Sequence, residues 1–523
     1  MSRFLLGAAG LNALLLLPLW IRHDAWSPWL AADGWCLMAL AALLPGTLIG
    51  RIGRWMLAAM IAVTWLTMLA DTALRLSLGR SLNLLLDWPL LDALYRLLAG
   101  NLGKFAALAI LALSVISIGL LVLGLRYLLG HYRVSRPWLL GMAGVALLAM
   151  VAGWLERPLP RVTSPMANTL VVQVQRMAET WQARSEFQAT LDAEASTARV
   201  LTRLADKNVI LVFIESYGMA TLEDERFAAV VVPGLRESGE RLDAAGLSVV
   251  SGRLTSPIQG GQSWLAHATA LSGRWIDNQL VYQLLLDSDH ATLVDDFRAT
   301  GHETLAVMPA ITLAWPEGRA YGFDRIYAAD DLDYAGPALN WVTMPDQFTL
   351  DRFQRDIRGS LDGPMFAKLA LISSHAPWTP VLPVIDWDDV GDGEIFARWA
   401  DSGESPEELW QTMERVREQY ARAIDYAVSA TLHWAAVNVD EDTLVIVMGD
   451  HQSSPMIVGD EADTEVPVHV ISGDESLTRP FRERGFVTGM LPDTDGSAAR
   501  MAHLRTWLHD AFSRDSTPEE TSP

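Results

Sequence analysis

The stretch Lys207 to Gly218, KNVILVFIESYG, joins a continuous apolar run to a carboxylate. Val209 to Ile214 form an unbroken row of apolar residues, which is typical of a strand buried on both faces of a sheet. Glu215 follows this row at once, and a second apolar run, TLVIVMGDHQ, ends in the same way at Asp450 and His451. Because ligands bind beyond the carboxyl ends of strands in open α/β sheets, we expect these side chains to face one crevice.

Further short apolar runs surround these two in the second half of the chain: GLSVVSGRL, ETLAVMP, FAKLALISS and VPVHVISG. Continuous apolar strands separated by helices predict an α/β domain with a central, mostly parallel sheet that is covered on both faces. We place this domain at residues 207–510. The polar end of the chain, residues 511–523, is expected to be disordered.

The first 155 residues have a different pattern, with five long apolar segments: Phe4 to Ile21, Trp29 to Gly50, Trp55 to Leu74, Phe105 to Leu129 and Trp138 to Leu155. Each approaches or exceeds the roughly 20 residues that a helix needs to cross a bilayer. Helices buried in a soluble protein are the alternative, but five such runs in succession are hard to cover with protein. We therefore predict a transmembrane domain of five helices over residues 1–155.

The connections between these segments indicate the orientation. Their basic residues fall mainly on one side: Arg3, Arg51, Arg54, Arg126, Arg133 and Arg136. The positive-inside rule then places the N-terminus in the cytoplasm and, after five crossings, the large domain outside. We treat the first segment as an uncleaved anchor, since it lacks a small-x-small cleavage site.

Two connecting regions complete the organisation. Residues 80–100 carry leucines at helical spacing around Asp87, Asp92 and Arg96, which predicts a helix lying in the outer membrane interface. A sixth span broken at Pro89 is the alternative. Residues 156–206 are rich in Ala, Gln and Glu and predict a helical linker between the two domains.

Charge and cysteine content limit the functional classes. Residues 1–160 contain 12 Lys and Arg against 6 Asp and Glu, so the remaining chain carries −28 of an overall net charge of −22. Such an acidic domain argues against nucleic acid as a partner. The single cysteine, Cys36, lies in an apolar segment, which excludes both a disulfide framework and a cysteine zinc site.

A candidate nucleophile lies in SPIQGGQSWLAHATALSG. Gly260 and Gly261 allow a tight turn, and Ser263 is expected at the N-cap of the helix that follows. A hydroxyl there would lie in the positive field of the helix terminus, where backbone N–H groups bind phosphate. A plain helix cap is the alternative for Ser263.

His375, at the end of ALISSHAPWTP, is a candidate hydrogen-bond donor to a phosphoryl oxygen or a leaving group, with a structural histidine as the alternative.

Together, the motifs FIES, GGQS, SSHAPW, EQYARAIDYAVSATLHW and VIVMGDHQ resemble the sulfatase and alkaline phosphatase superfamily. With the apolar first domain, the whole chain is similar to the bacterial lipoteichoic acid synthases, lipid A phosphoethanolamine transferases and periplasmic-glucan phosphoglycerol transferases. The resemblance implies one divalent metal ion, Mn²⁺ or Zn²⁺, bound by Glu215, Ser263, Asp450 and His451. It also implies Ser263 as the nucleophile that forms a phospho-serine intermediate.

Some positions depart from these families. A formylglycine sulfatase needs Pro two and Arg four residues after the modified residue, whereas Leu265 and His267 follow Ser263, so sulfate ester hydrolysis is disfavoured. Trp315 matches the phosphoglycerol transferases, but Met308 and Glu317 stand where basic residues are expected. Trp315, His267 and the strand residue His469 are kept as candidate substrate-binding residues.

The leading hypothesis is a membrane-anchored, metal-dependent phosphotransferase in the bacterial inner membrane. It would move a phosphoethanolamine or phosphoglycerol head group from a phospholipid donor to a glycan or lipid acceptor on the outer, periplasmic face. A phosphatase, phosphodiesterase or other sulfatase-like hydrolase, with water as the acceptor, is one alternative. A catalytically silent, lipid-sensing regulator is the other, although it would be expected to lack metal ligands that are present here.

Overall fold

The computed structural model describes the chain except for residues 1, 24–26, 89–90, 92–93, 96–97, 100–102, 131, 133, 156–158, 194–196, 314 and 514–523. Pro89, Asp92, Arg96, Arg133 and most of the tail expected to be disordered lie outside the described residues. The chain divides into two compact units, Met1–Glu186 and Phe187–Pro523. The division falls within helix α7 (Pro165–Ala193), which occupies much of the region predicted as a linker.

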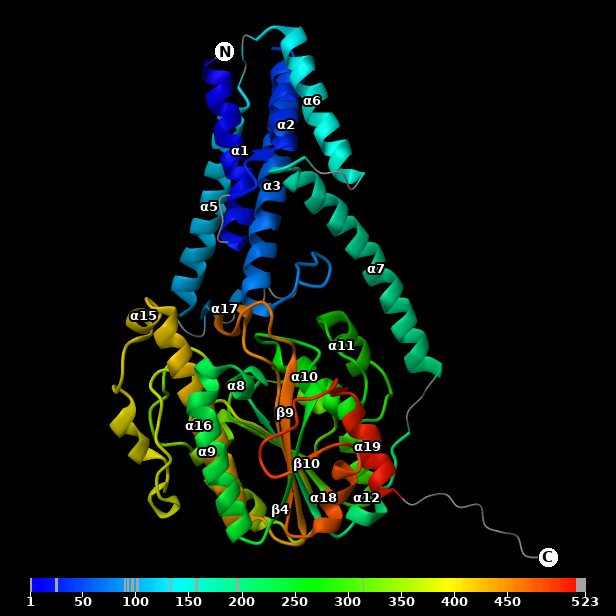
Figure 1. Cartoon of the computed structure of the whole chain (residues 1–523), viewed down its shortest axis with the longest axis vertical. Coiled ribbons are helices and arrows are strands. Elements are labelled where there is room, and N and C mark those ends of the chain that lie inside the picture. The colour runs from blue at the N-terminus through cyan, green and yellow to red at the C-terminus, as the bar shows by residue number, and fades with distance from the viewer. Residues whose placement is uncertain are drawn as a thin grey trace, which may run out of the picture. The chain divides into compact units, whose positions relative to one another are not determined.

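The first unit contains the apolar helices (Figure 1). In the part of the chain that the structure describes, four helices are long and apolar enough to cross a membrane: α1 (Ser2–His23), α3 (Leu48–Leu78), α5 (Lys104–Leu128) and α6 (Arg136–Trp154). By length and composition they mark the chain as a membrane protein.

The second predicted span is not a full-length helix, so the count of five spanning helices is not confirmed. Residues 29–50 contain the 12-residue helix α2 (Ala32–Leu43), followed by Leu44 in extended conformation and Pro45. Twelve helical residues rise about 18 Å, short of the roughly 30 Å of hydrocarbon. The residue before a proline avoids helical geometry, which explains why the helix ends here although the apolar sequence continues.

Buried polar groups hold α2 within this unit. Oδ2 of Asp33 accepts hydrogen bonds from the backbone N–H groups of Met166 (2.7 Å) and Ala167 (3.1 Å) in the first turn of α7. Two short strands, β1 (Leu30–Ala31) and β2 (Val162–Thr163), pair in parallel beside them. The chain entering α2 is therefore tied to the chain entering α7.

The second unit is built on a mixed sheet, which has nine strands among the described residues, in the order β10-β4-β9-β8-β3-β7-β5-β6, with β11 beside β4. The strands are β3 (Asn208–Ile214), β4 (Ser248–Thr255), β5 (Glu303–Met308), β6 (Arg325–Ala328), β7 (Met365–Ala370), β8 (Thr443–Gly449), β9 (Glu465–Ser472), β10 (Val487–Thr488) and β11 (Ala499–Arg500). The run β8-β3-β7-β5-β6 is parallel, as predicted. The sheet as a whole is not purely parallel, because β9 pairs antiparallel with both β8 and β4.

Helices cover both faces of this sheet (Figure 1). Their bounds are α8 (Ala220–Glu223), α9 (Glu225–Ala244), α10 (Ser263–Ser272), α11 (Gln279–Leu286), α12 (Leu293–Thr300), α13 (Pro316–Ala320), α14 (Asp346–Arg352), α15 (Pro406–Leu409), α16 (Met413–Asn438), α17 (Pro455–Val458), α18 (Glu475–Arg482) and α19 (His503–Phe512).

Strand β3 separates two cores, because successive side chains of a strand point to opposite faces. Ile210, Val212 and Ile214 pack with α9, α14 and α16, whereas Leu211 and Phe213 pack with α10, α12 and α19. The central position of β3 thus explains its continuous apolar sequence. It also places the residue after Ile214 at the middle of one edge of the sheet.

Candidate active site

Glu215 and Asp450 follow two neighbouring strands at the same edge of the sheet. β3 and β8 are paired in parallel, with Ile214 opposite Gly449, so the two acids come next in register. The backbone N–H of Ser216 donates to Oδ1 of Asp450 at 2.8 Å. Ser216 has a φ of 58°, a left-handed turn that ends the strand. The expectation that both acids face one place is thus supported by their geometry.

Ser263 is delivered to these acids by the start of α10. Its Oγ lies 3.0 Å from Oε2 of Glu215, to which it donates, and 3.3 Å from Nε2 of His451. The helix begins at Ser263 and its N-cap is Gln262, which has a φ of 68°. Ser263 is therefore the first helical residue and not the predicted N-cap, although it still lies in the positive field of the helix terminus.

Glu215, Asp450 and His451 form a group of side chains that fits a divalent cation. One ligand atom from each lies within 4.8 Å of the others. Nε2 of His451 is 3.2 Å from Oε1 of Glu215 and 3.7 Å from Oδ2 of Asp450. Two carboxylates and one imidazole are ligands that Mn²⁺ and Zn²⁺ accept, and the Ser263 hydroxyl is close enough to join them.

The electrostatics of this group also favour a cation. Burial raises the pKa of Asp450 to about 7, and the charge of Glu215 adds to this effect. Burial alone would lower the pKa of His451, but Asp450 and Glu215 raise it to about 9. Although burial opposes it, His451 and His375 hold the pKa of Glu215 well below its usual value. A buried pair of acids that keeps a proton on a neighbouring imidazole is a place where a bound metal ion replaces that proton.

His375 reaches the group from the end of β7. The hydroxyl of Ser374 donates to the backbone carbonyl of Glu215 at 2.6 Å, which fixes the adjoining His375 near the acids. Nδ1 of His375 lies 2.7 Å from the carbonyl of Ala376, and its ring centroid is 6.0 Å from that of Trp341. Asp346 supports the loop, since its Oδ1 accepts from the backbone N–H groups of Ile372 and Ser373.

His267 and Trp315 both contact Lys368, a residue that the sequence patterns did not single out. Nδ1 of His267 is 3.1 Å from Nζ of Lys368, and this nitrogen is 5.6 Å from the centroid of the Trp315 ring. Burial and the charge of Lys368 hold the pKa of His267 well below its usual value, while the charge of Glu215 opposes this shift and that of His451 adds to it. A lysine in the apolar strand sequence FAKLALISS was the signal that could have identified Lys368.

His469 is not brought to the site. It is 0% exposed on β9, where its Nε2 lies 3.0 Å from the hydroxyl of Tyr217 and its Nδ1 lies 2.8 Å from Oγ of Ser251. Burial lowers its pKa to about 3, so the ring is neutral. With both nitrogens occupied in the core, this placement does not support the substrate-binding role expected for His469.

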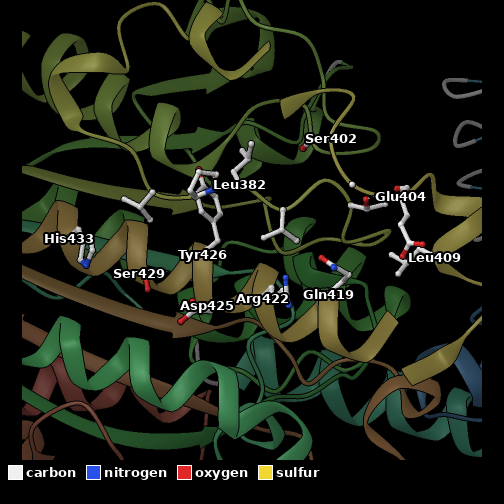
Figure 2. Close-up of a pocket in the computed structure, with 15 residues that line it drawn as sticks. Leu382, Ser402, Glu404, Leu409, Gln419, Arg422, Asp425, Tyr426, Ser429 and His433 are labelled. Carbon is white, nitrogen blue, oxygen red and sulfur yellow. Dashed lines mark hydrogen bonds between the residues drawn. The ribbon is translucent and has the colours of Figure 1, made fainter. Parts of the chain in front are cut away.

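A separate cavity of about 690 Å³ lies between α16 and the segment that follows His375. Figure 2 shows Tyr426 of α16 reaching toward Leu382 of that segment. Its other lining residues include Arg422, Asp425 and Ser429, but none of the four predicted metal ligands. The candidate reaction centre is therefore distinct from this cavity.

Residues 207–476 match the family model described as sulfatase. The chain belongs to the sulfatase family. This sulfatase-family chain has no match among curated protein sequences. The matched residues run from the strand before Glu215 to the first residues of α18, and so include every residue of the candidate reaction centre.

Several solved structures are similar to this sulfatase-family chain at low identity. The lipooligosaccharide phosphoethanolamine transferase A (EptA) of Neisseria meningitidis has a TM-score of 0.43 and 13% identity, with 95% of each chain covered. The lipoteichoic acid synthase LtaP of Listeria monocytogenes has a TM-score of 0.38 and 12% identity, covering 62% of this chain and 78% of that one. The phosphoglycerol transferase GacH of Streptococcus pyogenes has a TM-score of 0.39 and 13% identity, covering 64% and 80%.

Proposed function

We propose that this protein is a membrane-anchored, metal-dependent phosphotransferase that uses Ser263 as its nucleophile. The observation that carries the proposal is the convergence of Ser263 Oγ with Glu215 Oε2 at 3.0 Å and with His451 Nε2 at 3.3 Å. Along the chain, Ser263 is 48 residues from Glu215 and 188 residues from His451. The sulfatase family model and the charge pattern of the site support an enzyme over a silent regulator, because the whole ligand set is present.

The proposed substrate is a phospholipid with a phosphoethanolamine or phosphoglycerol head group. Oγ of Ser263 attacks the phosphorus, the bond from phosphorus to the diacylglycerol oxygen breaks, and the head group stays on Ser263 as a phosphodiester. Diacylglycerol leaves as an alcohol after taking up one proton, for which His375 is the proposed donor. A hydroxyl of a glycan or lipid acceptor then attacks the same phosphorus and gives its proton to His375, the bond from phosphorus to Oγ of Ser263 breaks, and Oγ takes up a proton from solvent.

The residues of the site have separate tasks in this scheme. The Ser263 hydroxyl, which donates to Glu215 in the structure, loses its proton to solvent before it attacks. A divalent ion held by Glu215, Asp450 and His451 would supply the Lewis acidity that makes this loss favourable near neutral pH. The first turn of α10 directs backbone N–H groups toward the phosphoryl oxygens.

We also infer five membrane crossings, with the N-terminus in the cytoplasm and the catalytic unit on the outer side of the inner membrane. α2 is short, but the residues that precede it are extended. Each of these residues adds about 3.3 Å to the length of the crossing. Their backbone groups are satisfied within protein, as a membrane interior requires: Trp29 N–H donates to the carbonyl of Arg161 at 2.9 Å, and Ala31 N–H donates to Oδ1 of Asn12 at 2.8 Å. This supports α2 as part of a fifth crossing.

The reaction is tested with purified full-length protein incubated with phosphatidylethanolamine or phosphatidylglycerol vesicles. Mass spectrometry of the Ser263 peptide should detect an adduct whose mass identifies the head group, and Ser263→Ala should show none. Release of free phosphoethanolamine or glycerol phosphate without an added acceptor would favour the hydrolase. Absence of bound metal, adduct and turnover would contradict the transferase and favour the regulator.

The orientation is tested separately through the single cysteine of the chain. Asp442, an exposed residue of the catalytic unit, is changed to cysteine in a Cys36→Ser background. A membrane-impermeant maleimide should label Asp442→Cys in intact spheroplasts. Labelling only after the membrane is broken would place the catalytic unit in the cytoplasm and overturn the five-crossing topology.

A further inference from the structure

Lys368 is a buried cation in the middle of the catalytic unit. It lies on β7 opposite Leu211 of β3, and its neighbours on the same face, Phe366 and Ala370, belong to the apolar core. The residue is only 1% exposed. It forms no ion pair within the described part of the chain. Direct neutralisation of a carboxylate is therefore not the role of its nitrogen.

The nitrogen of Lys368 has one strong acceptor. Nζ lies 3.1 Å from Nδ1 of His267, and its other contact is the sulfur of Met308 at 3.3 Å. The rings of Phe213 and Trp315 complete its surroundings, with centroids 5.9 Å and 5.6 Å away. While Lys368 carries its charge, its ammonium group can only donate, so Nδ1 of His267 accepts and the proton of this neutral ring lies on Nε2.

His267 connects Lys368 to the nucleophile. It lies four residues after Ser263, so both side chains share one face of α10, and helical side chains lean toward the turn that precedes them. Its ring packs on Phe213 with centroids 4.2 Å apart, and Phe213 precedes Glu215 by two residues on β3. The Nε2 atom is buried and has no hydrogen-bond partner among the described residues.

We propose that Lys368 is a positioning residue for the reaction at Ser263, which fixes His267 as the tautomer whose Nε2–H donates to a phosphoryl oxygen of the substrate. The inference rests on the proposed function of the site. It adds Lys368 as a residue that acts through His267. Lys368 contacts His267 at Nδ1, so it would act on the substrate only through this ring. His267 is the group that would touch the phosphoryl group.

Two further observations support a role beyond packing. A buried amine without a carboxylate partner destabilises a fold, so a purely structural residue at this position would be expected to be apolar. In addition, Met308 and Glu317 leave the segment around Trp315 without the basic residues expected there. The contact between Nζ of Lys368 and the sulfur of Met308 shows that β7 brings a positive group to this same segment.

The first test uses the tautomer of His267 in full-length protein labelled with ¹⁵N-histidine. Its signals are assigned by their loss in His267→Gln. At about pH 6, where Lys368 keeps its charge, the wild-type protein should show a protonated Nε2 and an unprotonated Nδ1. Lys368→Met, which removes the donor and keeps the length of the side chain, should shift the proton toward Nδ1 or mix the two forms. Met308→Leu, a packing change beside the same nitrogen, should leave the tautomer unchanged.

The second test compares kinetics with a chromogenic phosphodiester. Loss of a hydrogen-bond donor that acts on the transition state lowers kcat by about 10²-fold, and we expect this for Lys368→Met with little change in KM. His267→Gln, whose amide can place a donor near the position of Nε2, should retain more activity than His267→Ala. Lys368→Arg, which keeps a donor, should retain more than Lys368→Met.

Two outcomes of these two tests would overturn the inference. One is an unchanged tautomer in Lys368→Met, and the other is a changed tautomer with wild-type kcat. Titration with inorganic phosphate separates the inference from the proposed function. If the wild-type protein transfers no head group, yet phosphate shifts the Nε2–H signal of His267 and Lys368→Met weakens that effect about tenfold, the transferase proposal fails and the positioning role stands. If phosphate leaves that signal unmoved, the positioning role fails.

Discussion

The backbone N–H of Ser216 donates a 2.8 Å hydrogen bond to the side chain of Asp450, which joins the exits of β3 and β8 directly. The hydroxyl of the same serine donates to Oε1 of Glu215 at 2.9 Å. One residue in a left-handed turn thus contacts both acids of the proposed metal site. The site is therefore organised by the ends of two central strands, before any ligand binds.

Ser263→Ala should lower turnover by about 10³-fold or more, since it removes the proposed nucleophile. The fold should remain, because the side chain of Ser263 is only partly buried and its removal leaves no buried hydrogen-bond donor without a partner. Other hydroxyls nearby are engaged elsewhere: Ser256 donates to the carbonyl of Asp450 and Thr269 to that of Leu265. Enzyme assays and thermal unfolding check this prediction. Ser263→Thr, which keeps a hydroxyl, should retain measurable activity, and full activity in Ser263→Ala would exclude Ser263 as the nucleophile.

Glu215→Gln and Asp450→Asn should each lose bound metal, because each replaces a charged ligand with a neutral one. Metal content after dialysis, measured by mass spectrometry of the elements, gives the result directly. Asp442→Asn is the matched control, since Asp442 is an exposed acid paired with Lys207 away from the site. Equal metal content in all four proteins would contradict the assignment of the ligands.

Metal affinity should rise as the pH increases from about 6 to about 9. The pKa of His451 is raised to about 9 and that of Asp450 to about 7, so below these values the ion must displace protons from its own ligands. Calorimetric titration in buffers of different ionisation enthalpy should detect protons released on binding. An affinity that does not change over this range would argue against His451 as a ligand.

Lys368→Met should stabilise the catalytic unit while it lowers activity. Burial lowers the pKa of Lys368 from its usual 10.5 to about 7, so the folded protein binds this proton more weakly than the unfolded chain. The resulting destabilisation is complete below pH 7 and disappears as the pH rises toward 10.5. Unfolding midpoints should therefore favour the variant by more at about pH 6 than at about pH 9.5. A variant less stable than wild type at both pH values would contradict the pKa assignment.

Asp346→Ala should reduce activity by releasing the loop that carries Ser374 and His375. Oδ1 of Asp346 accepts from the N–H groups of Ile372 (2.8 Å) and Ser373 (2.9 Å). Asp346→Asn keeps an oxygen for these bonds and should keep activity. Burial raises the pKa of Asp346 to about 6, so its charge destabilises the fold above that pH, and Asp346→Asn should be at least as stable as wild type at neutral pH. Equal activity of the two variants would show that the loop does not depend on this contact.

Much of the reaction centre could be predicted from the sequence, because its parts are local. Glu215 directly follows one apolar strand, Asp450 and His451 come directly after another, and parallel strands bring such residues to one edge. Ser263 follows two glycines at a helix start. The Lys368–His267 contact could not be predicted in this way, since its partners are 101 residues apart and only the packing of α10 on the sheet joins them.

Features of the fold that depend on direction or length were less predictable. An apolar run such as residues 465–472 predicts a strand but not its direction, and β9 proved antiparallel to β8. That strand also contains His469, whose side chain points to Tyr217 and Ser251 and not to the reaction centre. Likewise, hydropathy over residues 29–50 does not report that the helix ends before Pro45.

The pairing of Ile214 with Gly449 has a consequence for how this chain tolerates change. Side chains along β3 and β8 can be exchanged for others of similar volume, since only their shape contributes to the core. Deleting or inserting a single residue in either strand is a different event, because it would turn every following side chain to the other face and move one acid out of line with its neighbour. Sequence drift in these two strands is therefore expected to proceed by substitution at constant length.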